Sequence, residues 1–480
     1  MLFFTHKKFT KKLFTKNEAD KMEFIGRKKE LGILAEVFSS NKMECVLVYG
    51  RRRIGKTELI KKAIQSLECP CIYYEAKQSS EMSNVSTLSE LISHNLGFPK
   101  LGFESFEEVL DFLFDQAKDR NMVFVLDEYP YLRSCIKGID SIIQTLVDKH
   151  LHTSKLKFVL CGSYVDTMKS LTERENPLYG RFTRTIDLKP MDYYESMMFY
   201  NSYSMEERIA LYSVFGGIPY YNQLIDSKKS VKDNIIRLIA SPNAILNNEV
   251  FLYLKNEITK INNANEVFES LAMGSSKFTD ILSKSHISSS PLLSDVLDKL
   301  IKMEIVAKRA PINDKNNKKK SGYYICDNFI LFYYKYIYRY SSQLNVMNEN
   351  AFFEYFIEED FYKSHVPYVF ENICQQYLIR KNKENKITPP FFDIGKYYYD
   401  DPVNKKNGEF DVVTQDPNGY IFYECKYRNE KITDKLVKQE IGQVKQAGLD
   451  CYKYGFFSKS GFDVDTQDNL ILFDLEQLFQ

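Results

Sequence analysis

Eight consecutive residues near the N-terminus have the types and spacing needed to hold a chain of phosphates. They are Gly50, Arg51, Arg52, Arg53, Ile54, Gly55, Lys56 and Thr57. They fit the pattern G-x-x-x-x-G-K-[ST] in full, between an apolar run at 45–49 and a helical pattern that begins at Glu58. The glycines let backbone N–H groups close around phosphates, and the helix N-terminus adds the positive end of its dipole. Lys56 can reach the β- and γ-phosphates and the Thr57 hydroxyl can hold Mg²⁺, so the sequence predicts a site for ATP with Mg²⁺.

A second group of residues supplies the acids that hydrolysis requires. The apolar run 122–126 ends in Asp127 and Glu128. Asp127 can order Mg²⁺ through water, and Glu128 can polarise the attacking water. Ser163 follows another apolar run and can sense a γ-phosphate, and Arg181 can supply a guanidinium in the same or an adjacent subunit. A surface role for Arg181 is the alternative.

Composition places few limits on function. The chain has 480 residues, which suggests two to four domains, and a net charge of +1, so any basic surface for nucleic acid must be local. No apolar run approaches the roughly 20 residues of a membrane span. The nine cysteines lack metal-ligand spacing, which favours reduced thiols in a cytoplasmic protein.

Several ordered motifs in residues 22–340 together resemble the archaeal-type ATPase family, a group of AAA+/STAND-like P-loop ATPases. The motifs are the segments 24–27, 49–57, 126–130, 161–163, 177–181 and 215–220. The resemblance implies an α/β ATPase core with a helical lid and a winged helix. It also implies that Ile25 and Arg27 lie near the adenine and that Pro219 begins a lid element close to the nucleotide.

The middle of the chain carries the pattern of a winged helix. Three short helical patterns, at 267–273, 277–284 and 292–303, precede two strand patterns at 304–309 and 322–325. Lys318, Lys319 and Lys320 lie between the strands and could contact DNA phosphates. A solvated hairpin tip in a module that binds protein is the equal alternative. The aromatic run at 327–337 favours a packed linker helix over a surface that stacks bases.

Near the C-terminus, two carboxylates and a lysine can meet on one hairpin. Strand patterns at 409–413 and 421–426 flank a turn at 417–420. Glu424 and Lys426 share one face of the second strand, and the hairpin can bring Asp411 beside them. Carboxylates hold a hard cation such as Mg²⁺, and a lysine can stabilise a phosphate or position the attacking water.

This D-x(n)-E-x-K arrangement resembles the PD-(D/E)XK nuclease superfamily. The resemblance implies a supporting acid at Glu371, on a helix that opens near 368, and adds Gln443 from a helix at 439–446. The first strand opens with Glu409, Phe410 and Asp411 instead of a Pro-Asp pair. A hairpin with exposed charges, or a nuclease fold without activity, is the alternative.

We therefore expect an α/β chain with a P-loop ATPase core on a parallel sheet, a helical lid, a winged helix and a C-terminal restriction-endonuclease-like domain. The expected bounds are an N-terminal extension at 1–21, the core at 22–190, the lid at 191–262, the winged helix at 263–326, an aromatic linker helix at 327–350 and the nuclease-like domain at 351–480. The predicted function couples an ATP switch to DNA binding and Mg²⁺-dependent cleavage, with a role in genome defence. The alternatives are a STAND-like regulator whose inactive C-terminal module binds DNA or protein, and an antitoxin or chaperone-type regulator. An oligomeric state is left open, and no membrane partner is expected.

Overall fold

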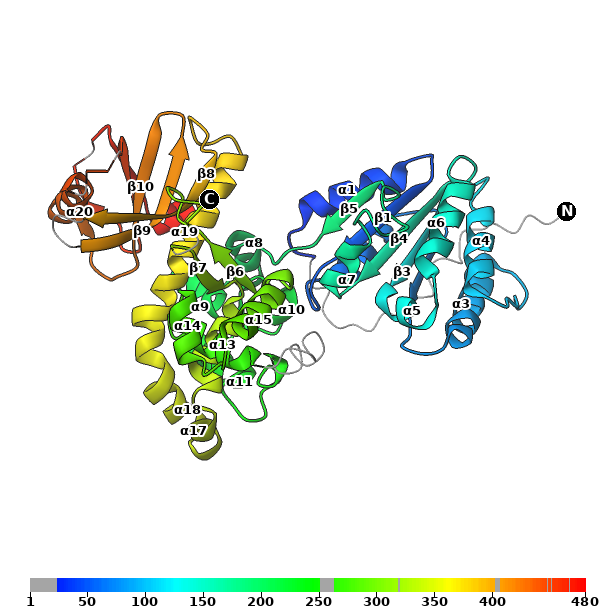
Figure 1. Ribbon diagram of the computed structural model, residues 1–480, viewed down its shortest axis with the longest axis horizontal. Coiled ribbons are helices and arrows are strands. Elements are labelled where there is room, and N and C mark those ends of the chain that lie inside the picture. Colours follow the sequence, from blue (N-terminus) through cyan, green and yellow to red (C-terminus); the bar gives the residue numbers. More distant parts are fainter. Residues whose placement is uncertain are drawn as a thin grey trace.

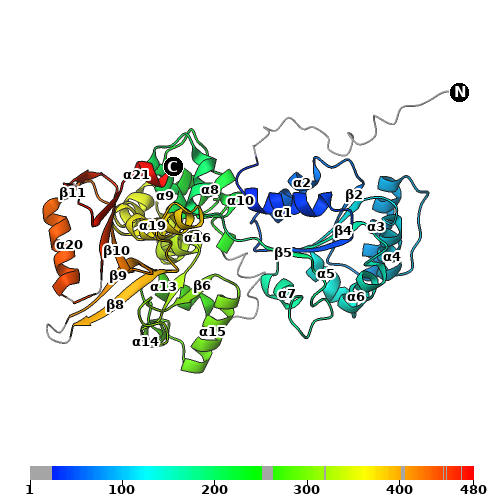
Figure 2. The same cartoon turned by 90° about the horizontal axis from the view of Figure 1, so that it is seen from above.

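The computed structural model describes residues 24–250, 263–317, 320–401, 406–446, 448–449, 451–465 and 467–480. The predicted extension at 1–21 lies outside these residues, as do Lys318 and Lys319 of the predicted wing and residues 251–262 of the predicted lid. Two five-stranded sheets lie toward opposite ends of the molecule, with helices between them (Figures 1 and 2).

The N-terminal sheet is entirely parallel and has the order β2-β3-β4-β1-β5. Its strands are β1 (Glu44–Tyr49), β2 (Cys71–Glu75), β3 (Met122–Asp127), β4 (Leu156–Gly162) and β5 (Arg184–Asp187). Every residue of β1, β3 and β4 is buried. These three strands read as continuous apolar runs because helices cover both faces of a parallel sheet.

The helices of this region divide between the two faces of the sheet. Side chains of α1 (Lys28–Ser39) and α2 (Lys56–Ile64) pack with Val46 and Val48 of β1 on one face. On the other face, Leu47 packs in a separate cluster with residues from the remaining helices. Those helices are α3 (Glu81–Leu96), α4 (Phe106–Gln116), α5 (Tyr129–Cys135), α6 (Ile139–His150) and α7 (Val165–Ser170). Alternate residues of one strand therefore build two cores, and the sheet is held rigidly between them.

A set of short helices follows the sheet. They are α8 (Tyr193–Met197), the 3-10 helix η1 (Met198–Tyr200), α9 (Met205–Phe215), α10 (Pro219–Gln223) and α11 (Val231–Leu238). The chain turns between α10 and α11. Ser230 caps α11 by accepting a hydrogen bond from Asp233 N at 3.0 Å, and Asn234 fastens the turn through Asp226 N at 2.9 Å. Two local side-chain bonds thus fix this turn.

The next elements appear in the predicted order of three helices and two strands. They are α13 (Ala264–Ala272), α14 (Phe278–Lys284), α15 (Ser290–Lys302), β6 (Val306–Arg309) and β7 (Gly322–Ile325). The strands β6 and β7 pair antiparallel. After them come α16 (Asn328–Phe332), the π-helical segment η2 (Tyr333–Tyr338), α17 (Ser341–Val346), α18 (Glu349–Phe353) and the π-helical segments η3 (Glu354–Glu358) and η4 (Phe361–His365).

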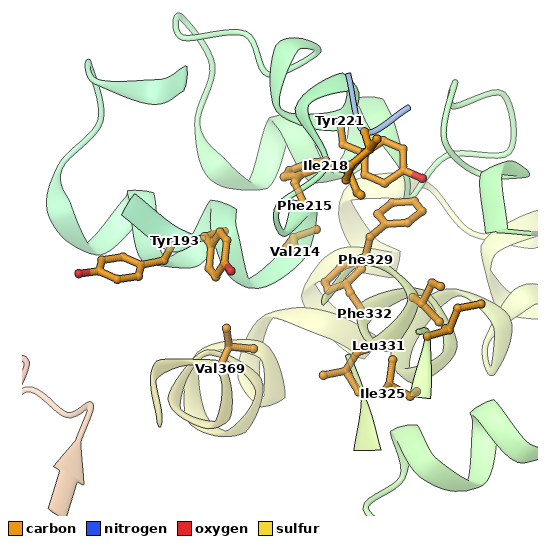
Figure 3. Close-up of a cluster of buried hydrophobic side chains, with 14 of the residues drawn as sticks. Tyr193, Val214, Phe215, Ile218, Tyr221, Ile325, Phe329, Leu331, Phe332 and Val369 are labelled. Carbon is orange, nitrogen blue, oxygen red and sulfur yellow. The ribbon is translucent and has the colours of Figure 1, made fainter. Parts of the chain in front are cut away.

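The aromatic run is packed rather than presented to solvent. Tyr334 and Tyr336 of η2 are 1% and 2% exposed, and Phe332 is fully buried. Figure 3 shows Phe329 and Phe332 of α16 facing Phe215 and Tyr221 from α9 and α10. These rings therefore fasten the middle helices together and offer no surface for stacking bases.

The C-terminal sheet has the order β14-β12-β10-β9-β8, in which β8, β9 and β10 form an antiparallel meander and β12 and β14 run parallel to β10. Its strands are β8 (Asp393–Asp401), β9 (Lys406–Asp416), β10 (Gly419–Lys426), β12 (Lys453–Ser458) and β14 (Leu470–Phe473), and a small separate pair joins β11 (Ile432–Thr433) to β13 (Phe462–Asp463). Residues of α19 (Val366–Lys383) pack with Val412 and Tyr423 in the large cluster. Residues of α20 (Asp434–Gln446) pack with Val413 and Phe422 in another, and α21 (Leu475–Leu478) ends the chain.

Candidate functional site

The glycine-rich loop lies at the carboxyl end of β1, an inner strand of the sheet, where open parallel sheets bind ligands. Gly55 has φ +92°, a conformation that a side chain would strain, and it begins α2. Lys56 is buried, and its Nζ donates to the carbonyls of Gly50 and Arg51 at 2.8 and 3.1 Å and to Ser163 Oγ at 2.9 Å. The loop thus holds its lysine folded back over its own backbone and against the end of β4.

The predicted acids meet this loop from the neighbouring strand ends. Thr57 Oγ1 donates to Asp127 Oδ2 at 3.1 Å, and Tyr73 OH donates to the same oxygen. Ser163 Oγ donates to Glu128 Oε1 at 2.9 Å. The other carboxylate oxygen of Glu128 is buried and has no hydrogen-bond partner among the described residues. Strands β1, β3 and β4 are neighbours in the sheet, which is why residues more than 100 positions apart in sequence, such as Lys56 and Ser163, lie within one hydrogen-bonded group.

These side chains fit a magnesium-bound triphosphate in kind and position. A hydroxyl and a carboxylate stand side by side, as the hard Mg²⁺ ion requires of oxygen donors. The orphaned Glu128 oxygen is a buried acceptor without a donor, which is the arrangement that a polarised water would satisfy.

The segment before α1 packs against the same loop. Arg27 adopts φ +57°, its Nη2 donates to the Ile54 carbonyl at 3.4 Å and its N–H donates to Glu195 Oε1 at 2.8 Å. Burial lowers the pKa of Arg27 and raises the pKa of Glu195. Ile25 is partly buried. Pro219 lies beside Gly55, since a methyl group on that glycine would stand 3.8 Å from Pro219 Cγ.

The arginines of the loop point away from Lys56 and toward other elements. Arg51 forms a buried ion pair with Asp327 at 2.9 Å, just before α16. Arg53 pairs with Glu249 and lies 4.3 Å from the centre of the Tyr220 ring. Arg52 and Glu58 are exposed. The structure therefore uses Arg51 and Arg53 to join the loop to the middle helices.

Arg181 is paired elsewhere in this arrangement. Its Nε and Nη2 donate to the Asp148 carboxylate of α6 at 3.0 and 2.8 Å. Its Nη1 donates to the Pro177 and Tyr179 carbonyls. To reach a γ-phosphate the guanidinium would first have to leave Asp148, so the surface alternative describes what is seen.

The C-terminal residues that the sequence singled out line one cavity of about 280 Å³. Its lining residues are Glu371, Tyr399, Glu409, Phe410, Asp411, Tyr423, Glu424, Cys425, Lys426, Glu440 and Gln443. The register explains the convergence, because Tyr423 pairs with Val412 and the next position sets Glu424 opposite Asp411. Helix α19 brings Glu371, and α20 brings Gln443.

Two lysines divide the carboxylates of this cavity between them. Lys426 Nζ lies 2.5 Å from Glu424 Oε1 and 3.2 Å from Glu440 Oε1. Lys396 Nζ lies 2.5 Å from Asp411 Oδ1 and 2.8 Å from Glu409 Oε1. Among the described residues, no three carboxylate, histidine or cysteine side chains stand close enough together to form a metal site as they are. The donors suit Mg²⁺ in kind, but their present arrangement is one of ion pairs.

Three further charged residues of this site, Lys396, Glu409 and Glu440, were not among the predicted site residues. Two of them had a signal: Glu409 alternates with Asp411 along β9, and Glu440 lies one helical turn before Gln443. Lys396 had none, because it reaches Asp411 from β8, where the register shifts between Gly395 and Tyr397. A local irregularity of this kind is set by the paired strands and leaves no pattern in the strand itself.

Burial and neighbouring charge change the ionisation of the cavity. Burial and, after it, the nearby Asp411 carboxylate together raise the pKa of Glu371 to about 8. Burial also raises the pKa of Glu424, although Lys426 opposes the shift. Glu371 is therefore largely protonated at neutral pH and can lose its proton when a cation arrives.

The predicted wing contacts the C-terminal sheet. Ile312 N donates to the Lys396 carbonyl at 2.7 Å, and the Asn313 amide exchanges bonds with the backbone of Tyr398 at 2.7 and 3.2 Å. Lys320 Nζ lies 4.7 Å from the centre of the Tyr398 ring and 3.3 Å from Asp314. The described part of this loop therefore covers the edge of β8, while its residues Asn313, Lys315 and Asn316 remain exposed to solvent.

The parallel sheet with its glycine loop, Lys56 and the Asp127–Glu128 pair defines a P-loop ATPase. Residues 24–225 match the family described as an ATPase domain predominantly from Archaea. This match concerns residues 24–225 and indicates a nucleotide-binding ATPase domain in that part of the chain. Residues 333–440 match a second family, described as archaeal and bacterial proteins of unknown function.

Two relatives come from Methanocaldococcus jannaschii. One, "Uncharacterized protein MJECL04", is 29% identical over 463 residues, which span 94% of this chain and 99% of that protein. The other, "Uncharacterized ATP-binding protein MJ0423", is 46% identical over 43 residues, which span 9% of this chain and 73% of that protein. Among solved structures, the Walker-type ATPase PABY2304 of Pyrococcus abyssi matches with a TM-score of 0.51 and 19% identity, over 65% of this chain and 96% of that one. This likeness concerns the fold. In the part of the chain that is described, no helix is long and apolar enough to cross a membrane.

Proposed function

We propose that this ATPase uses ATP and Mg²⁺ as a switch for a C-terminal site that binds DNA and cleaves it with Mg²⁺. The observation that carries the proposal is the cavity in which Glu371, Asp411, Glu424 and Lys426 meet from three separate elements. Asp411 lies on β9, and Glu424 and Lys426 lie on β10, which a hairpin turn joins to β9. Glu371 reaches the same cavity from the separate helix α19.

At the nucleotide site, Lys56 leaves its backbone acceptors and Ser163 to bind the β- and γ-phosphates. Thr57 and Asp127 would hold Mg²⁺, which neutralises charge that develops on the phosphates. Glu128 accepts a proton from the attacking water through its unpartnered oxygen. Ser163 accepts a hydrogen bond from Lys56 and donates one to Glu128, and it would register a γ-phosphate by donating to that phosphate instead of to Glu128.

At the C-terminal site, Asp411 and Glu424 would hold the metal ion, which supplies a nucleophile from bound water. Glu371 lends a carboxylate once it loses its proton, and Lys426 stabilises charge on the phosphate. Arg51 and Arg53 give the two sites a mechanical link, because they join the phosphate loop to the helices that lead to α19. The proposed bounds of the domains are those expected from the sequence, with a winged helix between core and nuclease-like unit.

The test is a cleavage assay with plasmid and linear DNA, in Mg²⁺ or Mn²⁺, with and without ATP. The full chain is compared with Asp411→Ala and Glu424→Ala, and with Asp434→Ala as a matched control on the opposite end of α20. We expect cleavage by the full chain and the control, none by the two site variants, and equal ATP hydrolysis by all four. Metal-dependent cleavage that survives Asp411→Ala would refute the assignment.

A second function has a specific observation in its favour. Lys396 pairs with Asp411, the residue that the proposal gives to the metal. In a regulator whose C-terminal cavity binds DNA or a protein without cleaving it, no metal would displace Lys396, and the Lys396–Asp411 ion pair would persist. In that case the chain would bind DNA or protein in an ATP-dependent manner while every cleavage assay stayed negative.

A further inference from the structure

Lys396 reaches the Asp411 carboxylate from the edge strand β8. Its ammonium lies 2.5 Å from Asp411 and 2.8 Å from Glu409, and its side chain is 23% exposed. The nuclease-like motif already supplies one lysine, Lys426, on β10. The motif includes no second cation such as Lys396. The Lys396 ammonium occupies the side of the Asp411 carboxylate that a bound divalent ion would need.

The hairpin between β6 and β7 holds β8 in place. Ile312 is 6% exposed and packs in the same cluster as Phe410 and Phe422, while its N–H bonds to the Lys396 carbonyl. Asn313 bonds the backbone of Tyr398 at both its N–H and its carbonyl. The loop thus pairs along the outer edge of β8 as an added strand would.

Two further contacts fix the hairpin over the same place. Lys315 forms an ion pair with Asp393 at the start of β8. From β7, the ring of Tyr324 stands 5.7 Å from Lys396 Nζ. The backbone bond at the Lys396 carbonyl and the ring near its Nζ restrict where the side chain can go, so its position is set by an element outside the C-terminal sheet.

We propose that Lys396 is a tethered cation that competes with the divalent metal for Asp411, and that the β6–β7 hairpin loop holds it in that position. This inference rests on the proposed function, since it concerns the regulation of the same site. A metal ion must displace the ammonium before it gains the Asp411 oxygens. Release of the loop from β8, for example when its lysines bind DNA phosphates, would free β8. The metal would then displace the Lys396 ammonium from Asp411 at a lower cost in free energy.

The experiment measures Mn²⁺ binding by calorimetry and by electron paramagnetic resonance, without nucleotide or DNA. Every protein carries Asp127→Asn, so that the N-terminal site lacks the carboxylate proposed to hold its metal. Lys396→Met should bind Mn²⁺ at least tenfold more tightly than the parent, because Asp411 loses its competitor. Lys396→Arg keeps a cation and should stay within about twofold of the parent, whereas a merely structural role for Lys396 would move both variants.

The loop and the controls complete the test. Asn313→Ala should tighten Mn²⁺ binding by a smaller factor, about threefold, because Lys396 stays but is less restrained. Lys363→Met, which removes an exposed lysine paired with Glu359, should have no effect. Adding Asp411→Asn to Lys396→Met should abolish the gain.

Two negative results can be told apart. If the parent binds Mn²⁺ through Asp411 and Lys396→Met binds it equally well, the tethered cation is refuted and the proposed function stands. If neither protein binds Mn²⁺ in a way that depends on Asp411, the metal site itself is refuted and the inference falls with it.

Discussion

The two candidate sites of this chain treat their lysines and acids in opposite ways. In the phosphate loop, Lys56 bonds only neutral oxygens, and Glu128 keeps one buried oxygen without a partner. In the C-terminal cavity, Lys396 and Lys426 are each neutralised by two carboxylates. The first site is ready for an anion and its metal, because exchanging neutral partners for charged ones is favourable. The second must break ion pairs before a metal can enter, so metal binding there can be prevented by keeping those ion pairs in place.

The largest expected effect tests the readiness of the N-terminal site. Lys56→Ala removes the buried ammonium, which would exchange its carbonyl partners for phosphate oxygens when ATP binds. ATP affinity, measured by calorimetry, should fall by about 100-fold or more. Mn²⁺ binding at the C-terminal cavity, followed without nucleotide, should stay unchanged. Retained ATP affinity would show that backbone donors alone hold the triphosphate.

The next effect separates binding from hydrolysis within the same site. Glu128→Gln keeps the shape and the bond from Ser163 but removes the negative charge that polarises water. The rate of ATP hydrolysis should fall by about 100-fold or more while the affinity for ATP stays within about threefold. An unchanged hydrolysis rate would mean that another group activates the water.

A third, smaller effect follows from the ionisation of the C-terminal cavity. The pKa of Glu371 is raised to about 8 by burial and by Asp411, so its carboxyl is protonated at neutral pH and a metal must displace that proton. Mn²⁺ affinity should therefore rise with pH between 6.5 and 8.5, by at most about tenfold per unit below the pKa. Calorimetry on Glu371→Gln should show weaker binding at the upper end and a flatter profile. A profile of the same steepness in that variant would assign the proton to a different group.

The smallest expected effect concerns the loop that covers β8. Replacing Lys318, Lys319 and Lys320 by Ala should weaken DNA binding about equally across sequences and lower the steepness of its salt dependence by about 2. The steepness comes from counterions released at phosphates, and Lys320 already packs on Tyr398. Lys228→Ala with Lys229→Ala serves as the control, since these lysines are exposed on the turn between α10 and α11. If DNA affinity and salt dependence do not change, the loop contacts only the protein.

The two sites also differ in how many of their contacts can be predicted from the sequence. For the phosphate loop, nearly every element follows from local pattern: the strand before Gly50, the helix after the loop and the acids at the end of β3 are present as predicted, although the helix begins at Lys56 rather than at Glu58. Parallel strands end at one edge of a sheet, so residues at consecutive strand ends are brought together by topology alone. The loop arginines were the exception, because Arg51 and Arg53 pair with residues far along the chain, Asp327 and Glu249.

For the C-terminal cavity, the sequence by itself determined which residues share a face: period-two alternation put Glu424 with Lys426, and the hairpin register put Asp411 opposite. Only the tertiary structure decided what those residues touch. Lys396 enters from a strand whose register shifts, and the loop at Ile312 and Asn313 reaches β8 from another unit. Alternation and motif spacing are short-range properties of a strand or helix, whereas the partner of a buried charge is fixed by the packing of distant segments.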